Sequence, residues 1–507
     1  MKDLTSHSLT AFFWGAGGAV TRIVLQLVTQ IALARILGPE QYGLFAIGAV
    51  VVSFSNFFSD IGIAYGLIQK RDVSHEDLRF VFTWQIILGS LVTFAIVIFS
   101  DEIASFFGET AASGVVLSLA GVCLLNALAA PSNNMLKRHM NFKRIQLAQL
   151  SGYVGGYILV GLPLALSGAQ VWALVVAWIV QSGITLVILY EGARHPLRLL
   201  FWHDDARSLS GYGATVFVTN VTNWMIGNID RVIVGRVFSG REIGLYATSY
   251  NMLQSPTSAL LGVLQPVFFS ASARVMDDQA RIAAGYYALI GAIFVFIFPA
   301  FASVSAVSET FVLAVYGESW IDAAVIFRPL ALAMPLFLIW GMTTPLLWAG
   351  GKPGREFKTQ LPVAVLWVGV SWLAAQHSLV MIGWAVCGMF ALRCGVIIFM
   401  ASRTLALAWR PLWAALRAGL VITIPCAITT ATLDLFLQGP LGGHPVLRLA
   451  LEVLAGILVY LLLLARAPGV VTPELAVLLN RFADRCPNLV ARYLNALSSR
   501  KVGYVAR

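Results

Sequence analysis

Long apolar runs separated by short polar breaks dominate the pattern of this chain. Each run is about 20 residues long, the length of an α-helix that crosses a bilayer, and the runs do not alternate as membrane β-strands do. Because lipid offers the backbone no hydrogen-bond partner, such runs must form helices. The pattern predicts an all-α polytopic membrane protein of about 14 transmembrane helices. Gly152, Gly155 and Gly156, within one apolar run, are predicted to permit close contact between helices, with a hinge as the alternative. The predicted spans are Leu9–Leu33, Leu44–Ile68, Val81–Phe99, Ser113–Ala129, Leu147–Leu166, Val171–Tyr190, Gly213–Val234, Ile243–Val263, Ile282–Val304, Ala323–Trp348, Leu361–Ala374, Leu379–Met400, Trp413–Phe436 and Leu447–Leu464.

Two segments of this pattern are nearly the same. Arg35 and Gly43 lie at a polar break between apolar runs, and Arg236 and Gly244 repeat their spacing 201 positions later. Within the first break, Gly38-Pro39 is predicted to end one helix and start the next. A duplicated helical bundle is typical of transporters that bind their cargo between two halves. The repeat predicts two pseudo-symmetric six-helix lobes and a two-helix extension. We expect domains at 1–200, 201–410 and 411–466, followed by a cytoplasmic amphipathic tail at 467–507.

Composition agrees with a membrane protein. Hydrophobic residues make up 59% of the 507 and charged residues 11%, against about 25% charged residues in soluble domains. The formal net charge of +10 is compatible with a nucleic-acid partner, but its lysines and arginines gather in alternate loops. With a cytoplasmic N-terminus these loops all face the cytoplasm, as the positive-inside rule requires. We therefore expect N- and C-termini in the cytoplasm, contacts with anionic membrane lipids, and no nucleic-acid partner.

Charged groups inside the spans are candidate site residues, because each costs about 2.5–3.5 kcal/mol to insert. Arg22 and Asn223 occupy equivalent places in the first helices of the two lobes, and Asp230 and Arg231 follow Asn223 in the same helix. These four are the predicted substrate-binding residues, since guanidinium groups bind anionic head groups through paired hydrogen bonds. A static pair of Asp230 with Arg231 or Arg22 is the open alternative. Asp60 and Asp230 are the candidates for coupling to H⁺ or Na⁺.

The chain predicts no catalytic centre, cofactor or metal site. It contains no nucleotide-binding loop, which argues against direct ATP hydrolysis. The polar break at 195–207 contains His203-Asp204-Asp205, but a metal site needs further ligands and no second cluster is present. We interpret this triplet as a solvated acidic turn, and the protein as one that is not an enzyme.

Three stretches carry a resemblance to a known family: LARILGPEQYGLFAIG (Leu33–Gly48), NNMLKRHMNFKR (Asn133–Arg144) and NIDRVIVGRVFSGREIGLYA (Asn228–Ala247). On these stretches the chain resembles the polysaccharide transport (Wzx-type) flippases of the multidrug/oligosaccharidyl-lipid/polysaccharide exporter superfamily. The resemblance covers roughly residues 5–407.

The resemblance implies a fold and a cargo. Two lobes would enclose a V-shaped cavity that opens alternately to either side of the bacterial inner membrane. The cargo would be a lipid-linked oligosaccharide, a repeat unit on undecaprenyl pyrophosphate that moves from the cytoplasmic to the periplasmic leaflet for exopolysaccharide or capsule biosynthesis. A polysaccharide polymerase and chain-length or export proteins would be partners. The resemblance implies cationic cavity residues for the anionic carrier, and among matching positions Arg22 and the Asp230-Arg231 pair fall in the corresponding first helices of the two lobes.

Other functions remain open at this stage. An ion-coupled multidrug exporter of the same superfamily would bind cations in an acidic cavity, against which Arg22 and Arg231 argue. A membrane-embedded glycan polymerase or ligase would need catalytic groups on a sizeable outer loop, and the predicted outer loops are short. A lipid scramblase is a third class that the pattern allows.

Overall fold

The computed structural model describes residues 2–60, 63–64, 67, 70, 72–203, 206–274, 278–349, 353–405, 407–466 and 471–477. Regular structure in these residues is entirely helical, and ten segments are long and apolar enough to cross a membrane. The predicted all-helical polytopic membrane protein is therefore confirmed. The finer count of fourteen spans stays a prediction.

The helices follow one another as α1 (Lys2–Asp60), α3 (His75–Ile98), α4 (Ser100–Phe106), η1 (Thr110–Ala112), α5 (Ser113–Arg138), α6 (Phe142–Tyr153), η2 (Val154–Gly161), α7 (Leu162–Leu166), α8 (Trp172–Gly192), α9 (Ala206–Val237), α10 (Gly240–Arg274), α11 (Gln279–Ala292), η3 (Ile293–Ile297), α12 (Phe298–Ala306), α13 (Ser308–Val315), η4 (Glu318–Trp320), α14 (Ala323–Ala349), α15 (Pro353–Ala375), α16 (Leu379–Thr404), α17 (Trp409–Leu437) and α18 (Pro445–Arg466).

A break at Gly38 divides α1 into two helices. Gly38 has φ 74° and ψ 174°, a conformation that glycine adopts without the steric cost of a side chain. Pro39 follows and has no N–H to offer the preceding helix. The predicted end of one span and start of the next at Gly38-Pro39 is thus confirmed, and the two spans predicted in this region are the two halves of α1.

Contacts divide the chain into two compact units. The first unit is Met1–Thr248 with Ser371–Leu379, and the second is Ser249–Val370 with Val380–Arg507. The first unit holds α1 to α9 and the start of α10. The lobe and domain boundaries predicted near residues 200 and 410 stay a prediction.

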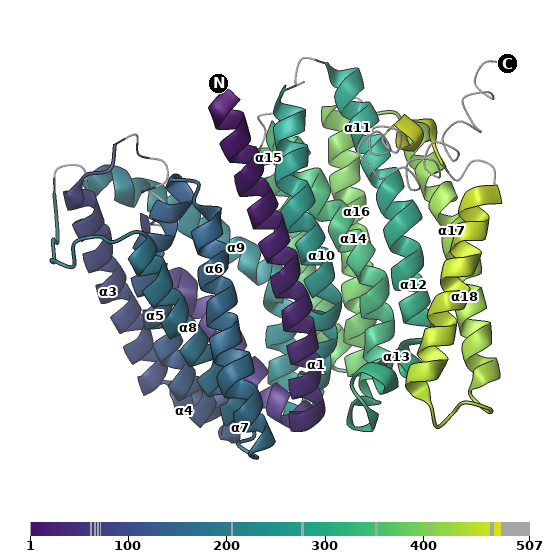
Figure 1. The fold of residues 1–507 in the computed structure, drawn as a ribbon, viewed down its shortest axis with the longest axis horizontal. Coiled ribbons are helices and arrows are strands. Elements are labelled where there is room, and N and C mark those ends of the chain that lie inside the picture. Colours follow the sequence, from purple (N-terminus) through teal and green to yellow (C-terminus); the bar gives the residue numbers. More distant parts are fainter. Residues whose placement is uncertain are drawn as a thin grey trace. The chain divides into compact units, whose positions relative to one another are not determined.

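Small residues let α6 and η2 approach α8 closely in the first unit, where α5, α6 and α8 lie side by side (Figure 1). A Cβ at Gly152 would lie 2.3 Å from Thr185 Oγ1, and one at Gly156 would lie 2.3 Å from the Ala177 carbonyl oxygen. Such contacts are what small residues provide in membrane bundles. The sequence interpretation of these glycines as packing positions is confirmed.

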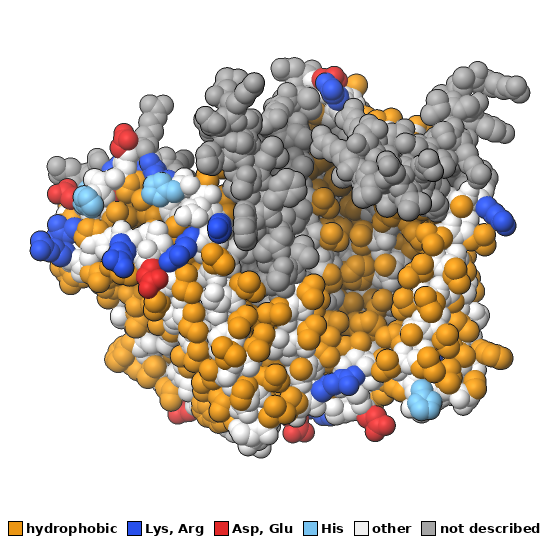
Figure 2. Space-filling view, viewed as in Figure 1, with side chains coloured by type: hydrophobic (Ala, Val, Ile, Leu, Met, Phe, Trp, Pro, Cys, Tyr) orange, Lys and Arg blue, Asp and Glu red, His pale blue; other side chains and the backbone are white. Residues whose placement is uncertain are grey.

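Large apolar side chains cover the outer faces of the helices. Leu91 and Phe94 on α3 are exposed, as are Leu435 and Phe436 on α17 and Leu458 on α18. Figure 2 shows a broad apolar surface over the middle of the helices, with most charged side chains near the helix ends. This distribution is the one expected of helices that contact lipid along their length.

The polar break after α8 packs against α3. His203 Nε2 lies 3.4 Å from Asp77 Oδ1, and the His203 side chain is only 8% exposed. Asp77 also accepts hydrogen bonds from Lys70 Nζ at 2.7 Å and from the Ser74 backbone at 2.8 Å. The interpretation of His203 as part of a solvated turn is therefore wrong, because its imidazole is buried beside Asp77 and the ring of Phe80 in α3. Asp204 and Asp205 lie outside the described residues.

The predicted amphipathic tail is described only at its start. Thr472 Oγ1 accepts a hydrogen bond of 3.3 Å from the Leu475 N–H, and the Leu475 side chain is fully buried in a cluster with Ala418 and Ile422 of α17. The first turn of the tail thus packs against α17 within the second unit. The rest of the predicted tail lies outside the described residues.

Candidate functional site

Polar and aromatic side chains of α1, α5 and α9 meet inside the first unit. Trp224 Nε1 on α9 donates a 3.1 Å hydrogen bond to Ser53 Oγ on α1, and the Trp224 ring lies 4.8 Å from the ring of Phe54. Close to Ser53 on α1, Asn56 Oδ1 accepts a 3.3 Å hydrogen bond from Asn126 Nδ2 of α5. Indole, hydroxyl and amide groups therefore gather along this part of α1.

The exposed side chain of Asn126 indicates which environment this group of residues faces. Asn126 lies near the middle of α5, which is long and apolar enough to span the membrane. The hydrocarbon of a bilayer offers an amide no hydrogen-bond partner. Polar side chains exposed at that depth normally face water or a polar ligand rather than lipid. The group is therefore a candidate contact for a polar cargo.

One face of α9 carries the predicted arginine. Trp224, Asn228 and Arg231 are spaced four and three residues apart, which places them on the same side of a helix. Asn228 Nδ2 donates to the Trp224 carbonyl oxygen at 3.0 Å, and Arg231 Nη1 lies 3.5 Å from Asn228 Oδ1. Since Trp224 also contacts Ser53, this is the face of α9 that meets α1. The Arg231 guanidinium thus belongs to the same polar region.

Asp230 points elsewhere, although it is the neighbour of Arg231 in sequence. Its side chain is 1% exposed, and its Oδ2 accepts a short hydrogen bond from the Tyr246 hydroxyl of α10. This bond joins the two helices that flank the turn at Ser239. The assignment of Asp230 to substrate or to ion coupling stays a prediction.

The other three predicted site residues are placed only by their backbone. Arg22 and Asp60 lie in the two halves of α1, and Asn223 lies in α9 next to Trp224. Their side chains lie outside those that the structure describes. The predicted roles of Arg22 and Asn223 in substrate binding, and of Asp60 in coupling, remain predictions.

The duplicated sequence motif forms a symmetric contact between α1 and α10. A Cβ added at Gly43 would lie 1.7 Å from the carbonyl oxygen of Gly240, and one at Gly244 would lie 1.8 Å from that of Pro39. The 201-residue step relates Gly43 to Gly244 and Pro39 to Gly240. Each contact is therefore the counterpart of the other in the internal repeat. Glu109 Oε1 accepts a short hydrogen bond from the Gly240 N–H at the start of α10. The motif glycines therefore act in packing.

Sequence reasoning missed the uncharged members of this polar region. Ser53, Asn56, Asn126 and Trp224 carry no charge, and the sequence search for candidate sites weighed mainly charged groups. Two amides inside apolar spans are a detectable signal, since polar side chains are scarce and costly in the bilayer. Their pairing required the structure, because Asn56 and Asn126 are 70 positions apart.

Comparison with known proteins finds a family model described as "Polysaccharide biosynthesis protein" that matches residues 32–325. The lipopolysaccharide biosynthesis protein WzxC of Escherichia coli (strain K12) is 25% identical over 324 residues. That match covers 63% of this chain and 65% of WzxC. The teichuronic acid biosynthesis protein TuaB of Bacillus subtilis (strain 168) is 22% identical over 471 residues, which cover 92% of this chain and 97% of TuaB.

Among solved structures, the fold is similar to that of the lipid II flippase MurJ in its inward closed conformation. The TM-score is 0.73 at 14% identity, and the match covers 88% of this chain and 97% of MurJ. At this identity the likeness concerns the fold alone. It extends the match beyond residues 32–325, into the part of the chain that the family model does not cover.

Proposed function

Because this chain belongs to the polysaccharide biosynthesis protein family, we propose that it flips a lipid-linked oligosaccharide across the bacterial inner membrane. Family membership makes the protein a multi-pass membrane transporter of polysaccharide biosynthesis rather than an enzyme. The cargo in this proposal is a repeat unit on undecaprenyl pyrophosphate. It moves from the cytoplasmic to the periplasmic leaflet by alternating access, for exopolysaccharide or capsule biosynthesis.

The polar region of α1, α5 and α9 is the observation that carries the proposal. Sugars and a pyrophosphate cross a bilayer slowly, because their polar groups lose water and gain no replacement partner. Asn56, Asn126 and Asn228 offer amides, and Trp224 offers an aromatic surface, where the surrounding spans are apolar. A carrier with such groups replaces part of the lost hydration while the prenyl chain stays in lipid.

Arg231 is the described residue best suited to the anionic part of the cargo. Arginine keeps its charge under all physiological conditions and offers paired donors to phosphate oxygens. Its guanidinium lies on the face of α9 that meets α1, beside Asn228. In the proposal Arg22 and Asn223 complete this contact from the first helices of the two lobes.

Energy coupling in this proposal uses H⁺ or Na⁺ at Asp60 or Asp230. Asp230 is buried and is hydrogen-bonded to Tyr246, so a change of its protonation state would change the contact between α9 and α10. A polysaccharide polymerase and chain-length or export proteins are the proposed partners. They would use the repeat unit after it reaches the periplasmic leaflet.

Substitution of the polar region tests the proposal. We expect Arg231→Ala, Arg22→Ala and Asn126→Ala to reduce polymer export in a strain that lacks the native gene. A hydrogen bond to a charged group contributes about 1.5–3 kcal/mol, so Arg231→Ala should lower the transport rate by about 10- to 100-fold. The measurements are exported polymer and the lipid-linked glycan that accumulates in the inner leaflet.

Leu117→Ala provides the matched control, because Leu117 is an exposed apolar residue of the same helix as Asn126. It should leave export and protein abundance unchanged. Normal export by all three polar variants, at normal abundance, would contradict the proposed site. If deletion of the gene leads to no accumulation of a lipid-linked glycan, the proposed cargo is contradicted.

A further inference from the structure

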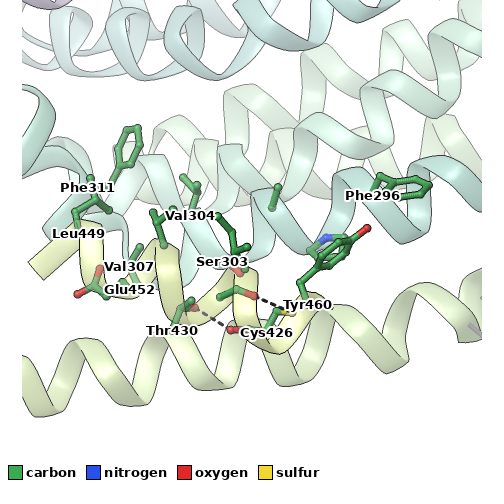
Figure 3. A pocket seen from close by; sticks show the side chains of 15 residues that line it. Phe296, Ser303, Val304, Val307, Phe311, Cys426, Thr430, Leu449, Glu452 and Tyr460 are labelled. Carbon is green, nitrogen blue, oxygen red and sulfur yellow. Dashed lines mark hydrogen bonds between the residues drawn. The ribbon is translucent and has the colours of Figure 1, made fainter. Parts of the chain in front are cut away.

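A second polar group lies in the second unit, at the edge of an apolar pocket. The pocket of about 480 Å³ lies between α12, α17 and α18 and is lined almost wholly by apolar side chains. Figure 3 shows Glu452 of α18 toward one end of it, beside Leu449 and Val307, and Tyr460 toward the other. Glu452 is fully buried. A carboxyl group in such a place needs an explanation, because a buried charge is costly unless it is paired.

Three helices bring two carboxyl groups and one guanidinium together here. Arg448 of α18 donates to Asp434 Oδ1 of α17 from Nε at 2.9 Å and from Nη2 at 2.6 Å. Thr310 Oγ1 of α13 donates to the same carboxylate oxygen. Arg448 Nε also lies 3.4 Å from Glu452 Oε1, one helical turn away. The Arg448 guanidinium therefore lies beside both acids, which brings the Asp434 and Glu452 side chains to one cation.

Within this group, Asp434 accepts the short hydrogen bonds from Arg448 and Thr310, and Glu452 accepts none. Both oxygens of Glu452 are buried and accept no hydrogen bond from the described residues, and the approach of Arg448 at 3.4 Å is longer than its two bonds to Asp434. With both acids ionised, the group would carry one uncompensated negative charge in an apolar surrounding. When two carboxyl groups share such a site, one of them holds a proton.

The other titratable groups on the packed elements are directed to different partners. Arg328 of α14 donates to Ser308 Oγ at 3.2 Å, and Cys426 of α17 contacts the Gly456 carbonyl oxygen at 3.9 Å. Glu309 of α13 and His444, just before α18, are exposed, and Tyr460 lies at the other end of the pocket. Among the described residues, Arg448 is therefore the cation placed to balance Asp434 and Glu452.

We propose that Asp434 and Glu452 form a proton-binding site in α17 and α18, which holds one proton between two carboxyl groups balanced by Arg448. A proton fits better than a metal cation, because hard cations take several oxygen ligands and the pocket beside Glu452 is apolar. This proton accompanies transport in place of an ion at Asp60 or Asp230, a part of the proposal that rests on the proposed function. Release of the proton leaves a buried charge, so the packing of α18 on α13 and α17 depends on it.

Infrared difference spectroscopy on the purified full-length protein in lipid nanodiscs tests the site directly. We expect a protonated-carboxyl stretching band that persists at pH values where exposed carboxyl groups are ionised. The band should be lost in Glu452→Gln. It should also be lost in Asp434→Asn, because Glu452 then becomes the sole counterion of Arg448 and ionises.

Glu309→Gln is the matched control, since Glu309 is an exposed acid of the adjoining α13, and it should leave the band unchanged. Absence of the band from the native protein at every pH, or its full retention in Glu452→Gln, would overturn the site. Loss of the band when sodium is added at constant pH would also overturn the site, because it would show that a metal cation binds there in place of the proton. If a variant fails to fold, the presence or absence of the band in the native protein still tests the site.

Transport assays separate the site from its role. In proton-loaded vesicles with the lipid-linked glycan, Glu452→Gln should lose the dependence of transport on a pH gradient, which Glu309→Gln should keep. A gradient dependence that Glu452→Gln retains would overturn the coupling role. Failure of the native protein to move the glycan contradicts the proposed function instead, and the infrared band still decides the proton site.

Discussion

Two glycines related by the internal repeat hold the tightest described contacts between α1 and α10. Gly43 and Gly244 each face a backbone carbonyl oxygen that an added methyl group would meet at 1.7 and 1.8 Å. A carbonyl oxygen belongs to the main chain and cannot turn aside as a flexible side chain does. Both residues lie within helices and have ordinary φ values, so their backbone conformation does not require glycine. The close approach of another backbone is what excludes a side chain at these positions.

We expect Gly43→Ala and Gly244→Ala each to destabilise the protein. Overpacking typically costs about 1–3 kcal/mol, and here the backbone itself has to move. Thermal unfolding in detergent, followed by the loss of monodisperse protein, measures the effect. Gly121→Ala on α5 is the control, since its new methyl group would meet no atom within 4 Å. Equal melting temperatures for the three variants would contradict this account of the motif.

At the level of elements, the segment after α8 is held against α3 by polar contacts. Arg79 Nη2 donates to the Leu199 carbonyl oxygen at 3.1 Å, and the Leu200 N–H donates to Thr83 Oγ1 at 2.8 Å. His195 is 5% exposed, and its ring lies 5.0 Å from that of Phe82. The described part of the polar break at 195–207 is thus fixed by contacts with α3.

Docking of this segment should weaken as the pH falls. Burial lowers the pKa of His195 below its ordinary value of 6.5, against a smaller opposite effect of the Pro196 carbonyl. An undocked His195 therefore binds a proton at a higher pH than a docked one, so docking stability rises with pH. It should be fully present above pH 6.5 and decline below it. Hydrogen exchange of residues 195–203, corrected for intrinsic rates, measures this opening.

His195→Gln provides the comparison, because it removes the titrating imidazole and leaves His203 and Asp77 in place. The pH dependence of exchange in this segment should then largely disappear. An unchanged pH dependence in His195→Gln would assign the effect to another group.

At the level of the whole molecule, the distribution of lysine and arginine predicts the orientation in the membrane. Glu102 of α4 and Lys143 of α6 are both exposed and lie between predicted spans, in segments expected on opposite sides of the membrane. A membrane-impermeant maleimide applied to intact spheroplasts should label Glu102→Cys, and should label Lys143→Cys only after permeabilisation. The native thiols of Cys123, Cys394 and Cys426 are buried, and the native protein measures any background. The reverse pattern would invert the predicted topology.

Much of the fold was predictable from the sequence, and so was part of the site. Apolar runs of span length predicted the helices, Gly38-Pro39 predicted the break in α1, and Gly152 and Gly156 were recognised as packing positions. Arg231 was singled out because charge inside a span is rare. Asn56, Asn126 and Asp434 were missed, and Glu452 was not selected as a site residue. The role of each depends on partners from other helices, which the sequence does not show.

The sequence alone determined that this protein is a helical membrane protein with an internal repeat in its sequence. Hydrophobicity and span length are local properties, and the bilayer leaves the backbone few alternatives to the helix. Only the tertiary structure decided that Asp230 contacts Tyr246 while Arg231 contacts Asn228, and that the His203 ring is buried beside Asp77. Side-chain partners are set by which helices pack together, and that packing brings together residues far apart in the chain.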